Sequence, residues 1–510
     1  MSQINNQRIA KNTILLYIRT FFVMIITLYT SRVILRVLGV EDYGVYQVIG
    51  GLVAMFSVIS GALSTAISRF ITYEIGNNNQ DKLKKIFATS VVIQLIIAAV
   101  VFILAEVIGI WFMQEKMQIP EGRMYAAQWV LHCSLITFCI NLLSVPYNAC
   151  IIAHEHMKAF AYVSVFEALI RLGICFLITV SPFDRLISYA VLLTLTAVVI
   201  RLIYGIYCSR HFEESRTKIK FHKPIFKEMF GFAGWSFFNN AMSVFNNQGV
   251  NMLINVFFGV SFNAARGIAT QVENAVIQFV NNFTVAVNPQ ITKSYAAGDL
   301  DGMHRLVCRG AKFSYFMMFM MALPLICEAD KILSLWLVEV PPSAVILVQL
   351  SLVLGIFDCV GSSGFTACMA TGKLKKYSIV ISSIAFLEFP LSWLAFSLGG
   401  PVVSAYYLYI VVKAAVLIAR LFLMQEMVSL PVSMFVRSVF VPIIMTTVIS
   451  IIPMAIIIIT MPESVPRLIL SVAIGVSSVA LASLFIGMTT DERRVVLSKA
   501  KEVKTKILGK

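Results

Sequence analysis

The sequence predicts an all-α polytopic membrane protein with about 14 transmembrane helices. Hydrophobic residues make up 59% of the 510 residues and charged residues only 13%, whereas a soluble domain carries about 25% charged residues. The mean hydropathy is +0.85, and the apolar runs are long rather than short and alternating, as a membrane β-barrel would require. The formal net charge of +15 lies mostly in loops between these runs, which indicates membrane orientation and not nucleic-acid binding.

Fourteen apolar segments are long enough to cross a hydrocarbon layer of about 30 Å at about 1.5 Å per residue. They cover roughly residues 13–38, 44–70, 86–113, 124–152, 159–180, 185–208, 229–257, 263–288, 311–336, 343–370, 377–398, 402–424, 438–460 and 466–487. Basic loops alternate with loops that are almost free of Lys and Arg, apart from Lys116, Arg123, Arg185 and Arg467. Because basic loops stay in the cytoplasm, both termini are expected there, and an even span count agrees.

A long basic connection, Ser209–Glu228, follows the sixth span and separates two predicted lobes. The predicted parts are an N-terminal lobe at 1–215 (spans one to six), a C-terminal lobe at 216–424 (spans seven to twelve), appended spans thirteen and fourteen at 425–487, and a basic cytoplasmic tail at 488–510. An apolar–Gly–Val turn closes span one at Leu38–Gly44 and recurs after span seven at Phe258–Ala264. Such a repeat predicts two six-helix lobes related by an axis along the membrane normal.

Spans seven and eight carry polar stripes. Asn240, Ser243, Asn247, Asn251 and Asn255 follow steps of three and four residues in span seven, so they share a helix face. Span eight repeats the pattern with Arg266, Thr270, Glu273, Asn274, Gln278 and Asn281. A few such residues would be hydrogen-bonding contacts between helices. Two neighbouring helices with so many polar residues are more typical of the wall of a hydrated cavity, because side-chain amides that face lipid would have no hydrogen-bond partners.

Several arginines lie inside predicted spans, where each is costly unless it snorkels or faces water or a partner. Span one contains Arg19, Arg32 and Arg36, span two ends near Arg69, and span eight begins near Arg266. Arg32 and Arg36 share a face, whereas Arg19 lies on a different side of an unkinked helix. Snorkelling is the alternative for residues near the span ends. Arg171 is expected to pair with Glu167, and Arg201, Lys413 and Arg420 are expected to be structural or interfacial.

Three carboxylates inside spans, Glu273, Asp358 and Glu388, are candidates for coupling substrate movement to a proton or sodium gradient. A second acidic group, Glu328 and Asp330, lies beside Lys331 near the outer end of span nine, where these charges are expected to neutralise one another.

Metal, cofactor and enzyme chemistry are not expected. The nine cysteines contain no CxxC pair, and His154-Glu155-His156 lacks the i, i+4 spacing of a helical zinc site. The sequence has no GxxxxGK[ST] phosphate-binding loop and no recognisable nucleophile–His–acid arrangement. We therefore expect no metal site, no cofactor and no catalytic residues.

Three stretches carry a resemblance to a known family: Leu28–Gly51, Ala62–Gly76 and Asn246–Val272. With the span layout, they resemble the polysaccharide flippases of the MOP exporter superfamily, which handle O-antigen and capsule repeat units, and more distantly the lipid II flippases and multidrug exporters. The lipid II flippases use arginines near the end of their first helix in a similar Ser-Arg context, which matches Ser31-Arg32 and Arg36. An arginine in their span eight matches Arg266. The Asp that often follows the second arginine is missing here.

The resemblance implies transport of an undecaprenyl-diphosphate-linked oligosaccharide from the cytoplasmic to the periplasmic leaflet of a bacterial inner membrane, by alternating access through a cationic cavity. Arginine binds phosphate oxygens in a fixed fork, and amides can bind sugar hydroxyls. The expected substrate-binding residues are Arg19, Arg32, Arg36, Arg69, Arg266, Asn247, Asn251 and Asn274. Expected partners are the lipid-linked glycan, the bilayer, and a polysaccharide polymerase with other assembly proteins.

Three alternatives are weighed at this stage. A glycosyltransferase or ligase would usually need a large external loop or soluble domain, whereas the outer loops here are all short. A multidrug exporter of the same superfamily would usually have twelve spans and favour cationic substrates. A non-transporting scaffold of a glycan-assembly complex would have no need for two amide-striped helices.

Overall fold

The computed structural model describes residues 2–57, 67, 70–71, 74–75, 79–154, 156–371, 374–494 and 496–498, and the regular elements among them are all helices. Side chains are described from residue 19 onward, with further gaps such as 230–240. Contacts divide the chain into two compact units. Unit 1 comprises Met1–Gly267, Leu337–Ser343 and Ala385–Ala405, and unit 2 comprises Ile268–Trp336, Ala344–Ile384 and Tyr406–Lys510.

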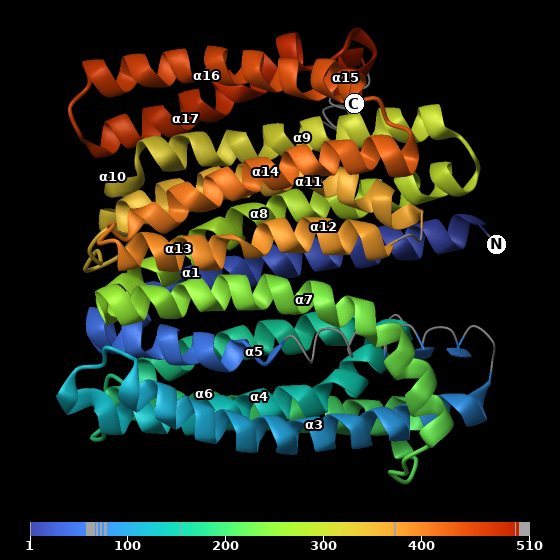
Figure 1. The fold of residues 1–510 in the computed structure, drawn as a ribbon, viewed down its shortest axis with the longest axis vertical. Helices are drawn as coiled ribbons and strands as arrows, with labels where there is room; N and C mark the ends of the chain where they lie inside the picture. The colour runs from blue at the N-terminus through green and yellow to red at the C-terminus, as the bar shows by residue number, and fades with distance from the viewer. Residues whose placement is uncertain are drawn as a thin grey trace, which may run out of the picture. The chain divides into compact units, whose positions relative to one another are not determined.

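Unit 1 is a helical bundle (Figure 1). Its helices are α1 (Ser2–Ala54), α3 (Gln80–Glu115), α4 (Met124–Ala153), α5 (Met157–Leu177), α6 (Arg185–His211), α7 (Lys223–Phe258), the start of α8 (Val260–Ala296) and α13 (Glu388–Ser397). Within this bundle α4 packs against α3 and α6, while α1 packs against α4, α5 and α7. Large apolar side chains on α3, such as Ile103 and Val107, are exposed, as expected for a helix that faces lipid.

Unit 2 is built around α9 (Leu300–Cys327) and α11 (Ala344–Ala370), which pack against each other. The other helices are the rest of α8, α10 (Ala329–Trp336), α12 (Leu374–Phe386), α14 (Val403–Val428), α15 (Val432–Phe435), α16 (Val441–Thr460) and α17 (Val465–Ala482). α16 and α17 lie side by side and contact α9 (Figure 1). A core of buried residues that includes Phe316, Phe319 and Phe435 joins these helices.

Eleven helices in the described part of the chain are long and apolar enough to cross a membrane. They confirm an all-α multi-pass membrane protein, whereas the finer prediction of fourteen spans stays a prediction. The remaining predicted spans fall on the segment that contains the undescribed residues 58–66 and on α7 and α8. The polar side chains of α8 lower its hydropathy, although 37 residues exceed the roughly 20 that a span needs.

Two glycine turns confirm the internal echo seen in the sequence. Gly39 interrupts α1 with φ 80° and ψ 172°, and Gly259 separates α7 from α8 with φ 85° and ψ 179°. Both residues adopt a left-handed φ that side chains disfavour, so glycine is required twice at corresponding positions. The turns also meet within unit 1: a Cβ added to Gly44 would lie 2.1 Å from the carbonyl oxygen of Val260.

The two units do not coincide with the predicted lobes, because α7 lies in unit 1 while the sequence assigns it to the second lobe. The predicted lobes are defined by the internal sequence repeat, whereas the two units are defined by contacts between residues in the structure. The lobe boundaries at 215/216 and 424/425 therefore stay a prediction.

The chain continues beyond α17 into a short helical segment that begins at Thr490. Thr489 and Glu492 form a capping box, because the Glu492 amide donates to the Thr489 hydroxyl and the Thr489 amide donates to the Glu492 carboxylate. The buried Glu492 carboxylate also accepts from Lys312 at 2.7 Å and from Arg309 at 3.1 Å. The start of the predicted basic tail is thus fixed to α9, within unit 2.

Candidate functional site

Arg32 and Arg36 are exposed and lie one turn apart on α1, directly before the Gly39 turn. Neither makes a hydrogen bond or ion pair with another described residue. The preceding Ser31 hydroxyl donates to the carbonyl of Thr27 at 3.0 Å, within the helix. Two accessible guanidinium groups on one helix face form a positively charged position that can accept an anion.

Arg19 differs from these two residues. Its guanidinium carbon lies 5.0 Å from the ring centre of Phe160 on α5, and its Nε atom is buried without a hydrogen bond. A cation–π contact therefore holds Arg19 against α5. The sequence likewise places Arg19 on a different side of the helix from Arg32 and Arg36. Arg69, the remaining arginine predicted in this half, lies outside the described residues.

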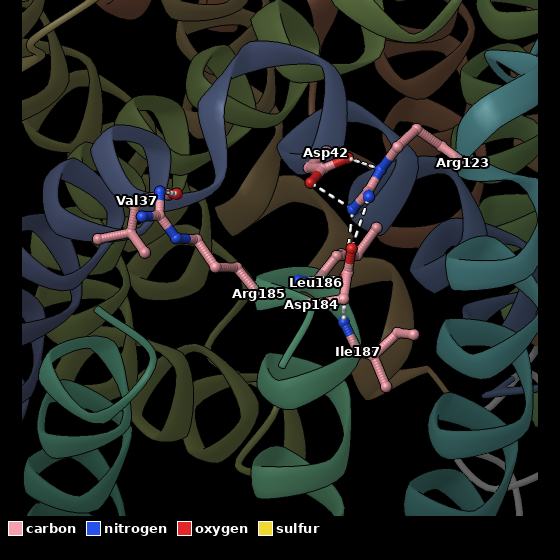
Figure 2. Close-up of polar contacts among 7 residues, drawn as sticks. All are labelled: Val37, Asp42, Arg123, Asp184, Arg185, Leu186 and Ile187. Carbon is pink, nitrogen blue, oxygen red and sulfur yellow. Dashed lines mark hydrogen bonds and ion pairs between the residues drawn. The ribbon is translucent and has the colours of Figure 1, made fainter. Parts of the chain in front are cut away.

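An ion-pair cluster fixes the segment that follows the Gly39 turn (Figure 2). Arg123, directly before α4, donates from Nε and Nη2 to Asp42 at 2.6 Å each. Its Nη1 donates to Asp184 at 2.6 Å and its Nη2 donates to the same carboxylate at 3.2 Å. One guanidinium thus joins α1, α4 and α6 by paired charge-assisted hydrogen bonds. We call Arg123, Asp42 and Asp184 the ion-pair cluster.

The ion-pair cluster extends to the α1 kink through the start of α6. Asp184 is the N-cap of α6 and accepts from the amides of Leu186 and Ile187. Arg185 donates to the carbonyl oxygen of Val37 at 3.2 Å (Figure 2), a carbonyl beside the interruption of the helix. Burial alone would raise the pKa of Asp184, but the hydrogen bonds from Arg123 and the Ile187 amide outweigh it and lower the pKa below its ordinary 3.8.

Some amides of α7 and α8 are buried and bonded to one another. Asn263 donates to the carbonyl oxygen and to the side-chain oxygen of Asn251, at 2.7 and 3.0 Å. Asn255 donates to Asn263 at 3.1 Å and accepts from the amide of Gln118 at 3.0 Å. Asn251 and Asn255 therefore join α7 to α8 and to the segment after α3. These two residues make hydrogen-bonding contacts between helices, the other interpretation of the polar stripes.

Asn247 and Arg266 form a more open part of the same stripe. Arg266 donates from Nη2 to the backbone carbonyl of Asn247 at 3.1 Å, and the Asn247 side chain is exposed. Both residues lie in unit 1. Asn274 is also exposed but lies in unit 2, and the side chains of Asn240 and Ser243 lie outside the described residues.

The three candidate coupling carboxylates have different surroundings. Asp358 on α11 pairs with Lys413 on α14, whose ammonium lies 4.9 Å from the ring centre of Tyr409. Glu273 on α8 lies near Cys359, beside Asp358. Glu388 is buried at the break between α12 and α13 in unit 1, where it accepts from the side-chain amide of Asn246. The Asn246 side-chain oxygen accepts a hydrogen bond from the Phe389 amide at 3.1 Å, in place of a backbone carbonyl at the break.

One acidic expectation is wrong. Glu328 does not neutralise Lys331; it is buried and accepts two hydrogen bonds from Arg467, at 3.0 and 2.9 Å. Ser471 adds a third at 2.8 Å. Glu328 pairs with Arg467 of α17 and not with Lys331, because a buried carboxylate is best stabilised by a partner that donates two hydrogen bonds in a fixed geometry. The predicted pair of Arg171 with Glu167 is confirmed at 2.8 Å.

The His154-Glu155-His156 motif is engaged in packing. His154 bonds to the buried Glu214 at 2.7 Å and stacks on Phe212 with ring centres 4.3 Å apart. His156 bonds to the Tyr207 hydroxyl at 2.8 Å. Within the described residues, no group of three His, Cys, Asp or Glu side chains could hold a metal ion.

The helical architecture defines a multi-pass membrane protein. Over 92% of this chain and 98% of the other, the fold is similar to "Lipid II flippase MurJ, inward closed conformation", with a TM-score of 0.72 and 13% identity. It is also similar to an inward-facing multidrug resistance MATE family transporter, with a TM-score of 0.65 and 13% identity over 79% of this chain and 95% of the other. For a MOP superfamily transporter from Pyrococcus furiosus, the TM-score is 0.62 at 12% identity, over 82% and 96%.

The chain belongs to the polysaccharide biosynthesis protein family, whose model matches residues 9–300. An uncharacterized membrane protein, EpsK of Bacillus subtilis (strain 168), is 20% identical over 320 residues. That alignment spans 61% of this chain and 62% of the relative's length. The chain is therefore a multi-pass membrane protein of the polysaccharide biosynthesis family, with a fold similar to the MATE and lipid II flippase structures.

Proposed function

We propose that this protein is a flippase that moves undecaprenyl-diphosphate-linked oligosaccharide units from the cytoplasmic to the periplasmic leaflet of a bacterial inner membrane. The observation that carries the proposal is the pair of exposed arginines, Arg32 and Arg36, on a helix of a chain that belongs to a polysaccharide biosynthesis family. An unpaired cation inside a membrane segment is costly. A substrate that brings its own anion supplies the missing partner during transport.

A diphosphate suits this position because it offers several oxygens to two planar guanidinium groups. The ion-pair cluster and the Arg185–Val37 hydrogen bond fix α1 around its Gly39 turn and thereby set where Arg32 and Arg36 lie. Arg266 and the exposed Asn247 side chain add a donor and an amide that can bind sugar hydroxyls. The prenyl tail stays in lipid, so only the polar headgroup has to cross.

In this mechanism, alternating access exposes the headgroup to one side of the membrane and then to the other. Asp358, paired with Lys413, and the neighbouring Glu273 are the proposed coupling groups, because a cation or proton that neutralises Asp358 would release Lys413. Both chain ends lie in the cytoplasm in this proposal, which follows the distribution of basic loops. The polymerase and other assembly proteins would receive the flipped product.

A deletion strain tests the proposal. Loss of the protein should remove the surface glycan and leave its lipid-linked precursor on the cytoplasmic leaflet. Plasmids that encode Arg32→Ala or Arg36→Ala should fail to restore export although the protein inserts at the wild-type level. Arg305→Ala, which removes an exposed arginine of α9, is the matched control and should restore it. Normal leaflet distribution and normal glycan in the deletion strain, with no paralogue present, would refute the proposal.

A further inference from the structure

Two lysines of unit 2 have carboxylate partners, and an arginine on the same helix as one of them has none. Lys312 donates to Glu492 at 2.7 Å, and Lys413 pairs with Asp358. Arg420 lies two turns after Lys413 on α14, but it forms no ion pair with a described carboxylate, and its buried Nε atom has no hydrogen-bond partner. A guanidinium without an anion is unfavourable away from water, so an anion from outside the chain is the expected partner.

Two glycines of α11 make room for this side chain. A Cβ at Gly361 would lie 1.6 Å from Nη1 and 2.8 Å from Cζ of Arg420. One turn later, a Cβ at Gly364 would lie 2.5 Å from Sδ of Met424 and in ordinary contact, at 3.6 Å, with Cδ of Arg420. Positions i and i+3 share a helix face, so the two glycines form one notch. The notch holds the guanidinium against the α11 backbone in one place.

A buried hydroxyl lies beside the guanidinium. Tyr377 of α12 is only 4% exposed, and its hydroxyl lies close enough to interact with the Arg420 side chain but has no partner at full hydrogen-bond geometry. A buried hydroxyl normally has a partner. An oxyanion would accept from both the hydroxyl and the guanidinium, and would satisfy the two groups together.

The notch lies toward the end of the helices that the basic loops place in the cytoplasm. Arg420 is eight residues before the end of α14 at Val428, or about 12 Å at about 1.5 Å per residue. Tyr377 is in the first turn of α12. Lys375 and Lys376 lie in the same turn. This depth corresponds to the headgroup side of the inner leaflet, within the reach of a snorkelling arginine.

We propose that Arg420 and Tyr377, held by the Gly361 and Gly364 notch, form a binding site for the phosphate group of a membrane lipid. The site is distinct from the arginines of unit 1. Its proposed role as a loading position for the diphosphate of the carrier lipid rests on the proposed function. The site itself requires only a phosphate-bearing headgroup, which an anionic phospholipid also provides.

Binding to the purified full-length protein tests the site. The probes are undecaprenyl diphosphate, phosphatidylglycerol and sodium pyrophosphate, with diacylglycerol as the phosphate-free reference, and native mass spectrometry measures occupancy. Arg420→Gln and Gly361→Ala should each weaken binding of the responsive probe at least about tenfold, which equals about 1.4 kcal/mol. Tyr377→Phe should weaken it about threefold. Arg420→Lys keeps the charge without the fork and should fall between Arg420→Gln and the wild type.

Two matched controls should bind like the wild type. Arg437→Gln removes an exposed arginine of unit 2, and Gly173→Ala adds a Cβ where no atom lies within 4 Å. An effect on undecaprenyl diphosphate alone identifies the carrier as the ligand, and an equal effect on phosphatidylglycerol identifies a general phospholipid headgroup. An effect on pyrophosphate identifies a site that needs no lipid tail, which contradicts the lipid assignment. Unchanged binding of all three probes in Arg420→Gln and Arg420→Lys would overturn the proposal.

The binding experiment on the notch and the transport experiment on the proposed function can fail independently. If Arg420→Gln leaves binding unchanged while Arg32→Ala abolishes transport, the notch fails and the flippase assignment stands. If only phosphatidylglycerol binding depends on Arg420 and the deletion strain exports glycan normally, the notch stands and the flippase assignment fails.

Discussion

Replacement of Arg123 by alanine should lower the free energy of unfolding by about 2–3 kcal/mol. The arginine makes four hydrogen bonds to Asp42 and Asp184, at 2.6 to 3.2 Å. A net hydrogen bond to a charged group contributes about 1.5–3 kcal/mol, and the contributions of one side chain do not add. Loss of a partner in a fully buried pair costs about 3–5 kcal/mol. The side chains are 25%, 16% and 31% exposed, so water screens part of this loss.

Thermal unfolding of the purified protein in detergent measures the effect, with Lys116→Ala as the control. Lys116 is an exposed residue at the end of α3 and its side chain makes no hydrogen bond with a described residue. Arg123→Ala should lower Tm by several degrees and Lys116→Ala by less than one. In a double-mutant cycle, Asp184→Asn should cost much less when Arg123 is already absent. Equal Tm values for Arg123→Ala and Lys116→Ala would refute the stabilising role of the ion-pair cluster.

Three further outcomes are expected. Gly44→Ala should lower the free energy of unfolding by about 1–3 kcal/mol, because the added Cβ would lie 2.1 Å from a backbone oxygen. Gly50→Ala adds a Cβ with no atom within 4 Å and should leave stability unchanged. Equal Tm values for the two variants would contradict the close approach at Gly44. Glu328→Gln should cost about 3–5 kcal/mol in chemical unfolding because it leaves the buried Arg467 with only the exposed Glu463, 3.8 Å away, as a carboxylate. A loss below about 1 kcal/mol would exclude a buried pair. The lowered pKa of Asp184 gives stability that is complete above its ordinary value of 3.8 and lost as the pH falls through the lower folded value. Asp184→Asn should therefore remove more stability at pH 6 than at pH 2, and the same difference at both would contradict the shift.

The sequence predicted the class of fold because hydropathy and loop charge report directly on the membrane. It also predicted the two glycine turns, since Gly39 and Gly259 stand in the same apolar–Gly–Val context and both require a left-handed φ. The charge pattern pointed to Arg123 and Arg185 as unusual residues in basic-poor loops. It could not show that Arg123 binds both Asp42 and Asp184, because those residues lie far apart in the chain.

The interior polar residues were harder to assign from periodicity. Asn247, Asn251 and Asn255 share one predicted face, yet Asn247 is exposed while Asn251 and Asn255 are buried in hydrogen bonds with Asn263. Helical spacing defines a face but not what covers each turn of it. Arg420 was expected to be structural or interfacial, and only the notch at Gly361 shows that its guanidinium is held in one place.

Reconstitution tests the flippase proposal most directly. Proteoliposomes that contain the purified protein and a fluorescent undecaprenyl-diphosphate-linked oligosaccharide should show protein-dependent movement of the glycan between leaflets, measured by quenching from the outside. Arg32→Ala and Arg36→Ala should slow this movement at least about tenfold, whereas Arg305→Ala should not. Wild-type protein that is folded and correctly inserted but leaves the glycan in its original leaflet, with and without an imposed proton or sodium gradient, would contradict the assignment.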